Sequence, residues 1–330
     1  MDIITHFREK VSGKGFSVVF PEGNDERIIK AARIIKDENI AAPIVLGKPE
    51  EIDSAAKTAG VNLDGIRTIN PRQSNRIEAY AEKYMSGRED DITPGIARRM
   101  VTRPLFYGGM MIACGDAGIA VGGIASATAT LIQAGVLTIG LSGGIKTASS
   151  YFLMIIPDFL GEKDKAFIYA DCAVNIDPNA EQLADIALAS AISARRILGE
   201  EPRVALLSFS TRGSASSPSV DKVKKALEIA RQREPDLKID GEFQADSAIV
   251  PRVAAKKVKD ASEVAGKANV IIFPDLDAGN IAYKLTQYMA HAQAIGPFLQ
   301  GFAKPITDLS RGATVEDVVS TTILTLVQLL

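Results

Sequence analysis

Residues 16–46 read FSVVFPEGNDERIIKAARIIKDENIAAPIVL and hold the pattern that decides the fold. The apolar run 16–20 predicts a buried strand, and the Pro- and Gly-containing segment 21–25 predicts a turn. A helix is expected over 26–38, because its apolar residues fall on one face: Ile28, Ile29, Ala32 and Ile35. Residues 42–46 predict a second strand, closed by Gly47. Two strands joined by a helix form a βαβ unit and imply a parallel sheet.

The same alternation continues along the chain. Further strands are expected at 119–121, 166–170, 204–209 and 270–273, and helices at 182–198, 220–233 and 315–330. One stretch, 117–145, carries no charge over a length that could cross a bilayer. Paired glycines interrupt it at 122–123 and 143–144, so we interpret it as a strand, a turn and a tightly packed helix. The sequence therefore predicts an α/β protein.

Composition narrows the class of protein. The 330 residues exceed one ordinary core, which favours two domains. Lys and Arg total 38 against 40 Asp and Glu, which excludes a strongly basic nucleic-acid binder. Two cysteines cannot form a disulfide framework, and with two histidines they cannot fill an ordinary zinc site. The N-terminus lacks the apolar core of a signal peptide. We expect a cytoplasmic protein that binds neither nucleic acid nor membrane.

Motif searches exclude several kinds of chemistry. The chain has no Gly-x-Gly-x-x-Gly fingerprint and no Walker loop. His6 and His291 stand alone and are better explained as surface or packing residues. Chemistry by a histidine triad, by zinc or by a Cys-His pair is therefore not expected.

Three strand-to-helix junctions could bind an anion, because ligands of open α/β sheets sit at the carboxyl ends of strands. The first, 210–218, holds Ser210, Thr211 and Arg212, and fits a phosphate site as well as an ordinary polar loop. The second, 274–280, precedes a helix with Lys284. Its two carboxylates, Asp275 and Asp277, could hold Mg²⁺ but are better explained as a helix cap.

The third junction, 308–317, supports two readings that are compatible. Thr314 and Asp317 have the spacing of a capping box that begins the last helix. Ser310 and Arg311 lie just before that helix, so a hydroxyl, a guanidinium and a carboxylate could converge on one anion.

At these residues the sequence resembles the phosphate acetyl/butyryltransferases, and most closely the phosphotransacetylases of the ethanolamine-utilisation type. The matching blocks cover nearly the whole chain and are residues 20–27, 146–154, 170–174, 241–246, 273–284, 296–301 and 308–317. The resemblance implies a two-domain, three-layer α/β/α fold similar to isocitrate and isopropylmalate dehydrogenases, with a cleft between the domains. Residues 1–145 and 299–330 would form domain I, and residues 146–298 domain II, which would mediate dimerisation.

The resemblance also implies an activity, reversible acyl transfer between acetyl-CoA and orthophosphate, with no metal or redox cofactor and with CoA as a substrate. Asp317 matches the family's proposed base, which would activate the CoA thiol for direct attack on acetyl phosphate in a ternary complex. Arg311 and Ser310 match the groups that stabilise the developing charge. The remaining substrate-binding candidates are Ser210, Thr211, Arg212, Thr128, Asn280, Lys284 and Arg88.

Two departures from the family pattern concern CoA. Gln133 stands where relatives have an arginine associated with CoA binding, and residues 86–91 replace a basic stretch and leave Arg88 as its cation. A lost phosphate contact would weaken binding by about 1.5–3 kcal/mol. Propionyl or butyryl transfer, or CoA binding without turnover, therefore remain alternatives. A metal-dependent 2-hydroxyacid dehydrogenase of similar architecture is a more distant alternative, because no nucleotide-binding fingerprint supports it. A bacterial microcompartment also remains open as the location.

Overall fold

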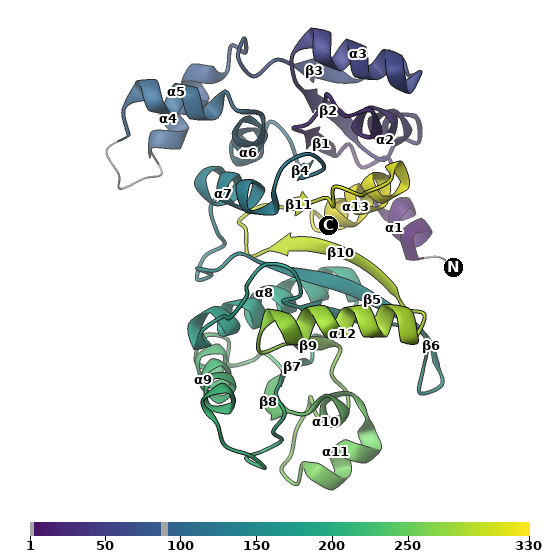
Figure 1. Ribbon diagram of the computed structural model, residues 1–330, viewed down its shortest axis with the longest axis vertical. Coiled ribbons are helices and arrows are strands. Elements are labelled where there is room, and N and C mark those ends of the chain that lie inside the picture. The colour runs from purple at the N-terminus through teal and green to yellow at the C-terminus, as the bar shows by residue number, and fades with distance from the viewer. Residues whose placement is uncertain (1–2, 87–91) are drawn as a thin grey trace. The chain divides into compact units, whose positions relative to one another are not determined.

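A computed structural model describes residues 3–86 and 92–330, which form two compact units (Figure 1). Unit 1 contains residues 1–142 and 302–330, and unit 2 contains residues 143–301. The chain thus leaves unit 1 once and returns to it for its last segment. The expected domain boundaries were 145/146 and 298/299.

Unit 1 is built on a parallel sheet with the strand order β11-β4-β1-β2-β3. Its strands are β1 (Ser17–Phe20), β2 (Ala42–Leu46), β3 (Arg67–Ile69), β4 (Ile119–Gly122) and β11 (Ile306–Asp308). All four residues of β4 are buried, as expected for a strand covered on both faces. The predicted βαβ unit is confirmed, because β1 and β2 pair in parallel across a helix.

The helices of unit 1 cover both faces of this sheet, and Figure 1 shows α2 on one side of the strands and α6 on the other. They are α1 (Ile3–Val11), α2 (Glu26–Asp37), α3 (Pro49–Ala59), α4 (Ile77–Ser86), α5 (Pro94–Val101), α6 (Pro104–Cys114), α7 (Thr128–Thr138) and α13 (Val315–Val327). The C-terminal α13 packs against α2 and α1. It therefore completes the layer that the N-terminal segment begins.

Unit 2 is built on a mixed sheet with the strand order β10-β5-β6-β9-β7-β8. Its strands are β5 (Ser149–Phe159), β6 (Glu162–Ala170), β7 (Val204–Leu207), β8 (Ile239–Phe243), β9 (Val270–Ile272) and β10 (Gln293–Gln300). The β5–β6 hairpin and the β10–β5 pair are antiparallel, and the remaining pairs are parallel.

Helices lie on both faces of this second sheet, with α12 and α8 on opposite sides (Figure 1). The helices are α8 (Ala180–Leu198), α9 (Pro218–Arg233), α10 (Ala245–Ile249), α11 (Pro251–Lys257) and α12 (Leu276–Met289). The ring of Tyr283 on α12 stacks on Phe152 of β5, with centroids 4.2 Å apart. Both units are thus α/β/α layers, which confirms the predicted fold class.

Most of the expected elements differ from the structure by a few residues at one end or the other, and two of these differences have a clear cause. β6 begins at Glu162 rather than 166, because it pairs with β5 as a hairpin that extends beyond the buried part of the sheet. β7 ends at Leu207 rather than 209, and Phe209 is 59% exposed. The apolar stretch 117–145 forms β4, a turn and α7 as predicted. Within the described residues, no helix is long and apolar enough to span a membrane.

Candidate functional site

The sheet of unit 1 has a topological switch point between β1 and β4. From β1 the chain continues to β2 and β3 on one side, whereas β4 and β11 lie on the other side. The loops that follow β1 and β4 therefore turn away from each other above the carboxyl ends of their strands. Crevices at such points are where open α/β sheets bind ligands.

Glu22 joins the two loops at this point. The residue is 7% exposed, and its carboxylate accepts hydrogen bonds from the backbone N–H groups of Gly123 (2.8 Å), Ile124 (2.9 Å) and Ala125 (3.0 Å). Three amide donors satisfy a buried carboxylate well. The sequence reasoning gave Glu22 no role, because its partners lie about a hundred residues away.

A pocket of about 400 Å³ opens beside Glu22, within unit 1. Its walls come from the segments after β1 and β2 and from the first residues of α6 and α7. The polar groups include Asn24, Ser126 and Thr130, and Phe106 forms part of the apolar wall. Arg103 also lines the pocket, with its guanidinium 5.3 Å from the centroid of the Phe106 ring. The pocket thus combines an apolar wall with one cation, Arg103, and the carboxyl groups of Glu22 and Glu51.

The loop between β11 and α13, residues 309–314, carries Ser310 and Arg311. Leu309 donates its N–H to the carbonyl of Gly122 (2.7 Å). Arg27 donates to the carbonyls of Arg311 (2.8 Å) and Ala313 (2.9 Å). The backbone of this loop is therefore held from two sides.

Arg27 is in turn held by Asp25 through two hydrogen bonds of 3.0 and 2.7 Å. The guanidinium of Arg27 lowers the pKa of the Asp25 carboxyl, and burial opposes this only in part. The Ser310 and Arg311 side chains remain exposed, and Arg311 forms no ion pair with a described residue. A fixed backbone with an unengaged guanidinium suits the capture of an anion.

Asp317 occupies the first turn of α13. Its Oδ2 accepts from the Thr314 N–H at 2.9 Å, and its own N–H donates to Thr314 Oγ1 at 3.1 Å. The predicted capping box is confirmed. The carboxylate is exposed, so its second oxygen can face a ligand. No hydrogen bond joins it to Ser310 or Arg311 among the described residues, and their convergence on one anion stays a prediction.

Thr128, a predicted substrate contact, is the first residue of α7. Its hydroxyl donates to Oδ2 of Asp308 at 2.5 Å. Asp308 is 6% exposed. Burial raises the pKa of the Asp308 carboxyl to about 6, and the charge of Glu22 adds to this, while the Thr128 hydrogen bond acts against it. The structure therefore gives Thr128 an internal partner that sequence reasoning did not foresee.

Ser210, Thr211 and Arg212 follow β7 in unit 2 and make internal contacts. The Ser210 hydroxyl is fully buried and donates to Glu242 at 2.8 Å. Burial favours a raised pKa for Glu242, but the hydrogen bonds from Gly213 N–H and Ser210 outweigh it and hold the pKa below its ordinary value. The Thr211 hydroxyl contacts Ser247 at 3.3 Å and accepts from the Gln244 N–H at 2.9 Å.

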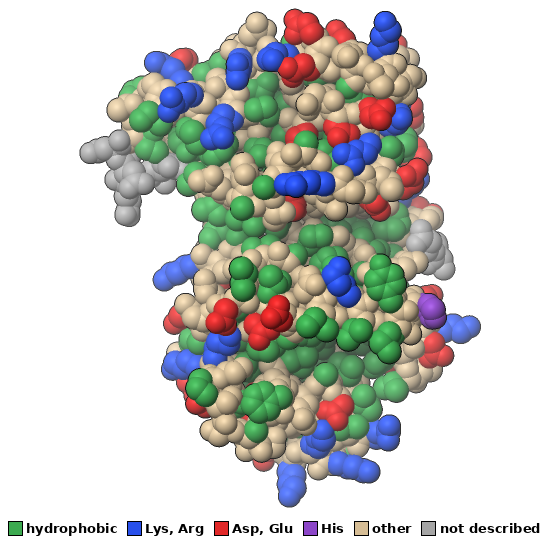
Figure 2. Space-filling model, viewed as in Figure 1, with side chains coloured by type: hydrophobic (Ala, Val, Ile, Leu, Met, Phe, Trp, Pro, Cys, Tyr) green, Lys and Arg blue, Asp and Glu red, His purple; other side chains and the backbone are tan. Residues whose placement is uncertain are grey.

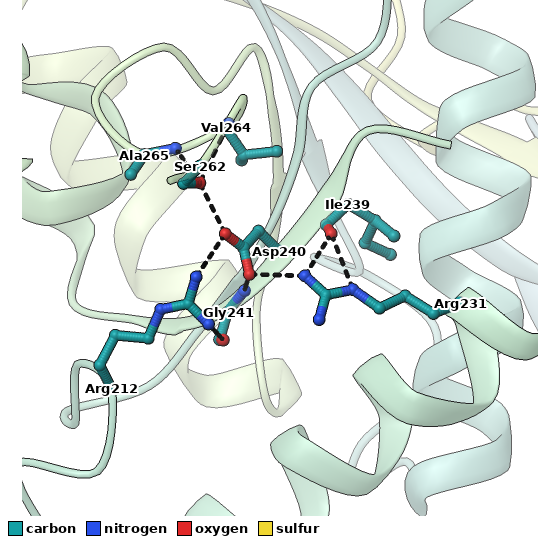
Figure 3. A network of polar contacts seen from close by, with 8 residues as sticks. All are labelled: Arg212, Arg231, Ile239, Asp240, Gly241, Ser262, Val264 and Ala265. Atoms are coloured by element: carbon teal, nitrogen blue, oxygen red, sulfur yellow. Dashed lines mark hydrogen bonds and ion pairs between the residues drawn. The ribbon is translucent and has the colours of Figure 1, made fainter. Parts of the chain in front are cut away.

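Arg212 belongs to a network around the buried carboxylate of Asp240 (Figure 3). Asp240 accepts from Arg212 at 2.7 Å, from Arg231 at 2.8 Å and from Ser262 at 2.6 Å. The hydroxyls and the cation of this loop thus stabilise the loop itself. A substrate contact from these three residues stays a prediction.

The other candidates of unit 2 lie on α12. Asp275 caps this helix by accepting from the Ala278 N–H at 2.8 Å, which confirms the capping interpretation. Asn280 donates to the Cys172 carbonyl at 3.2 Å, whereas Lys284 is exposed. Arg88, the remaining candidate, falls outside the described residues.

Residues 2–326 match the sequence profile of the phosphate acetyl/butaryl transferase family. The chain belongs to this family. The phosphate acetyltransferase of Thermoanaerobacterium thermosaccharolyticum is 44% identical over 329 residues, which are 99% of each chain. The match spans both units and includes the Ser310–Arg311 loop and Asp317.

Solved structures of phosphotransacetylases resemble the fold of this chain over nearly its whole length. A phosphotransacetylase from Streptococcus pyogenes superimposes with a TM-score of 0.91 at 40% identity, over 99% of this chain and 97% of that one. The EutD phosphotransacetylase of Staphylococcus aureus superimposes with a TM-score of 0.89 at 38% identity, over 100% of this chain and 98% of that one. A third structure, a Salmonella typhimurium protein described as a putative 4-hydroxythreonine-4-phosphate dehydrogenase, shares the fold alone. It superimposes with a TM-score of 0.54 at 12% identity, over 95% of this chain and 99% of that one.

The raised pKa of Asp308 predicts a dependence of stability on pH. The folded-state pKa of about 6 exceeds the ordinary value of 3.8, so the folded state binds the proton more tightly between pH 4 and 6. Relative to Asp308→Asn, the free energy of unfolding of the wild type should therefore fall by about 2–3 kcal/mol as pH rises from 4 to 7. Urea titrations of both proteins across this range measure the difference. A difference that does not change with pH would refute the shift.

Proposed function

We propose that the chain catalyses the reversible transfer of an acetyl group between CoA and orthophosphate: acetyl-CoA plus phosphate gives acetyl phosphate plus CoA. The observation that carries the proposal is the Ser310–Arg311 loop, whose backbone is held by Arg27 while the Arg311 guanidinium stays unengaged. The acetyl group is proposed because the relatives at 40–44% identity are named phosphate acetyltransferases. The same names give no support to propionyl or butyryl transfer.

The proposed reaction is a direct displacement in a ternary complex. The CoA thiol resembles that of cysteine, with a pKa of about 8.5, so it is mostly protonated at neutral pH. Asp317 takes the thiol proton as the sulfur bonds to the acetyl carbonyl carbon. The bond from that carbon to the bridging oxygen breaks, and phosphate leaves with the electron pair. The exposed Asp317 carboxylate is fixed by the capping box, which orients it for this transfer.

Arg311 and Ser310 act on the charge of the same reaction. The guanidinium neutralises the phosphoryl oxygens in a bidentate geometry that lysine cannot provide. The Ser310 hydroxyl accepts from the Gly312 N–H at 3.2 Å, which leaves its proton available for the developing oxyanion. Because a protein cation supplies this stabilisation, the reaction as proposed needs no metal or redox cofactor.

Replacing Asp317 and Arg311 tests these roles. Asp317→Asn keeps an oxygen for the cap but cannot take the proton, so kcat should fall by about 10²-fold. Arg311→Ala removes charge stabilisation and should lower kcat by about 10²–10³-fold, with partial activity in Arg311→Lys. The measurement is thioester absorbance after mixing acetyl phosphate with CoA.

Matched controls exist in the same unit. Glu316→Gln removes a carboxylate from the same helical turn, and Arg72→Ala removes an exposed arginine. Both should keep wild-type turnover. Full activity in Asp317→Asn and Arg311→Ala would overturn the site assignment, and an inactive wild type would overturn the proposed function.

We assign the pocket beside Glu22 to part of CoA, with Arg103 as its cation. Gln133, which stands where relatives have a CoA-associated arginine, is exposed on α7, and Thr130 of the same helix lines the pocket. Arg103 is exposed at the start of α6 and forms no ion pair with a described residue. Its charge is therefore available to a CoA phosphate.

Arg103→Ala should raise the KM for CoA by about tenfold, as expected for one charge-assisted hydrogen bond, and leave the KM for acetyl phosphate unchanged. Arg72→Ala again serves as control. Initial rates at varied CoA give the constants. An unchanged KM for CoA would exclude Arg103 from the CoA site.

We also propose a homodimer that forms through α12 of unit 2. Four large apolar side chains recur on this helix at helical spacing and are 52–76% exposed: Ile281, Leu285, Tyr288 and Met289. Figure 2 shows hydrophobic side chains gathered over this helix. A stripe of this kind on a single helix fits a two-fold contact with its own copy.

The free Cys114 and Cys172 fit a reducing, cytoplasmic setting.

Leu285→Asp should convert the proposed dimer to a monomer, because it places a charge in the middle of the stripe. Leu160→Asp, a matched change at an exposed leucine of the β5–β6 turn, should leave the mass unchanged. Sedimentation equilibrium measures both. A wild-type monomer, or a Leu285→Asp dimer, would contradict this interface.

A further inference from the structure

Asp308 connects three segments of unit 1. It is the last residue of β11, it pairs with Gly122 in the parallel ladder with β4, and it lies two residues before Ser310. Its carboxylate accepts the hydroxyl proton of Thr128, the first residue of α7, and the next N–H, of Leu309, donates to Gly122. The start of α7 and the start of the Ser310–Arg311 loop are thus tied to one side chain.

The second oxygen of this carboxylate lies against the backbone of Gly123. Oδ1 of Asp308 is buried and has no hydrogen-bond partner among the residues that the structure describes. A β-carbon at Gly123 would lie only 1.9 Å from it, and Gly123 has a φ of +99°. Only glycine therefore permits this approach, for steric and conformational reasons.

This arrangement is poor for stability. A buried carboxylate oxygen without a hydrogen bond of ordinary geometry loses its hydration, and the nearby Leu309 N–H, which lowers the pKa of this carboxyl, is itself bonded to Gly122. Glu22, from the loop after β1, is the charged group that faces Asp308 among the described residues, and it adds repulsion. An apolar side chain or an asparagine would avoid the repulsion, which indicates that the negative charge at this position serves another purpose.

We propose that ionised Asp308, together with Thr128, is a positioning residue for the acyl-transfer reaction, which fixes the start of the Ser310–Arg311 loop against α7 so that Arg311 meets the phosphoryl group. This inference rests on the proposed function. Thr128 is accordingly a positioning partner rather than a substrate contact.

Protonation of Asp308 should weaken this arrangement. A proton on Oδ2 takes the position from which this oxygen accepts the Thr128 hydroxyl, so the charge-assisted hydrogen bond of the ionised carboxylate is lost. Because the pKa of this carboxyl lies near 6, the change falls within the range that kinetics can sample. The tie between the start of α7 and the Ser310–Arg311 loop would then weaken, although the bonds from Leu309 and Arg27 still hold the loop backbone.

The test compares kcat from pH 5 to 8 for the wild type, Asp308→Asn, Thr128→Val and Thr128→Ser. The wild type should lose activity below about pH 6. Asp308→Asn should have about tenfold lower kcat at pH 8 and no decline near pH 6. Thr128→Val should lower kcat similarly, and Thr128→Ser should restore most of it. Thr58→Val, an exposed change on α3, is the matched control.

The outcomes separate this inference from the proposed function. A decline near pH 6 that persists in Asp308→Asn, or equal kcat in Thr128→Val and the wild type, would overturn the positioning role alone. A wild type without turnover of acetyl phosphate and CoA would overturn the proposed function and this inference with it. If Asp308→Asn fails to fold, the pair Thr128→Val and Thr128→Ser decides.

Discussion

The carboxylate of Glu22 is the interaction on which the site of unit 1 depends. The loops after β1 and β4 begin side by side, because these strands pair, but part at the switch point beyond the paired residues. Three backbone amides of residues 123–125 bind this one side chain and join the loops. The pocket, the start of α7 and the close approach of Asp308 to Gly123 all follow from where that join places the β4–α7 loop.

A division of labour follows between groups that hold the backbone and groups left for chemistry. Three charged side chains of unit 1 hold the backbone around the Ser310–Arg311 loop. Arg27 donates to the carbonyl of Arg311 and is itself held by Asp25, and Asp308 accepts from Thr128 at the start of α7. Arg311 itself is exposed. A guanidinium on a held backbone loses less conformational freedom when it binds an anion than one on a loose loop does, so more of the contact energy is available for catalysis.

Local patterns in the sequence were sufficient for the βαβ unit, the Thr314–Asp317 capping box and the Asp275 cap, because each depends on neighbours within a few residues. Contacts over long separations were not predictable in this way. Glu22 meets its amides about a hundred residues further along the chain, and Thr128 meets Asp308 across 180 residues. The hydroxyl-rich loop at Ser210 shows the limit most clearly. Its composition fits a phosphate site, yet the Ser210 hydroxyl donates its hydrogen bond to Glu242 on β8.

The near-neutral net charge of −2 is reconciled with polyanionic substrates by the same principle of local placement. Many cations of the chain are neutralised within their own unit, as Arg212 and Arg231 are by Asp240. Exposed Arg103 and Arg311 form no such pair with a described residue, and both belong to loops that flank the carboxyl edge of one sheet. Since an interaction with phosphate falls off within a Debye length of about 8–10 Å, two unpaired guanidiniums at that edge matter more than the total charge. The absence of a cation at Gln133 is therefore compatible with the proposed CoA site, because the local field decides phosphate binding and Arg103 lines the pocket proposed for CoA.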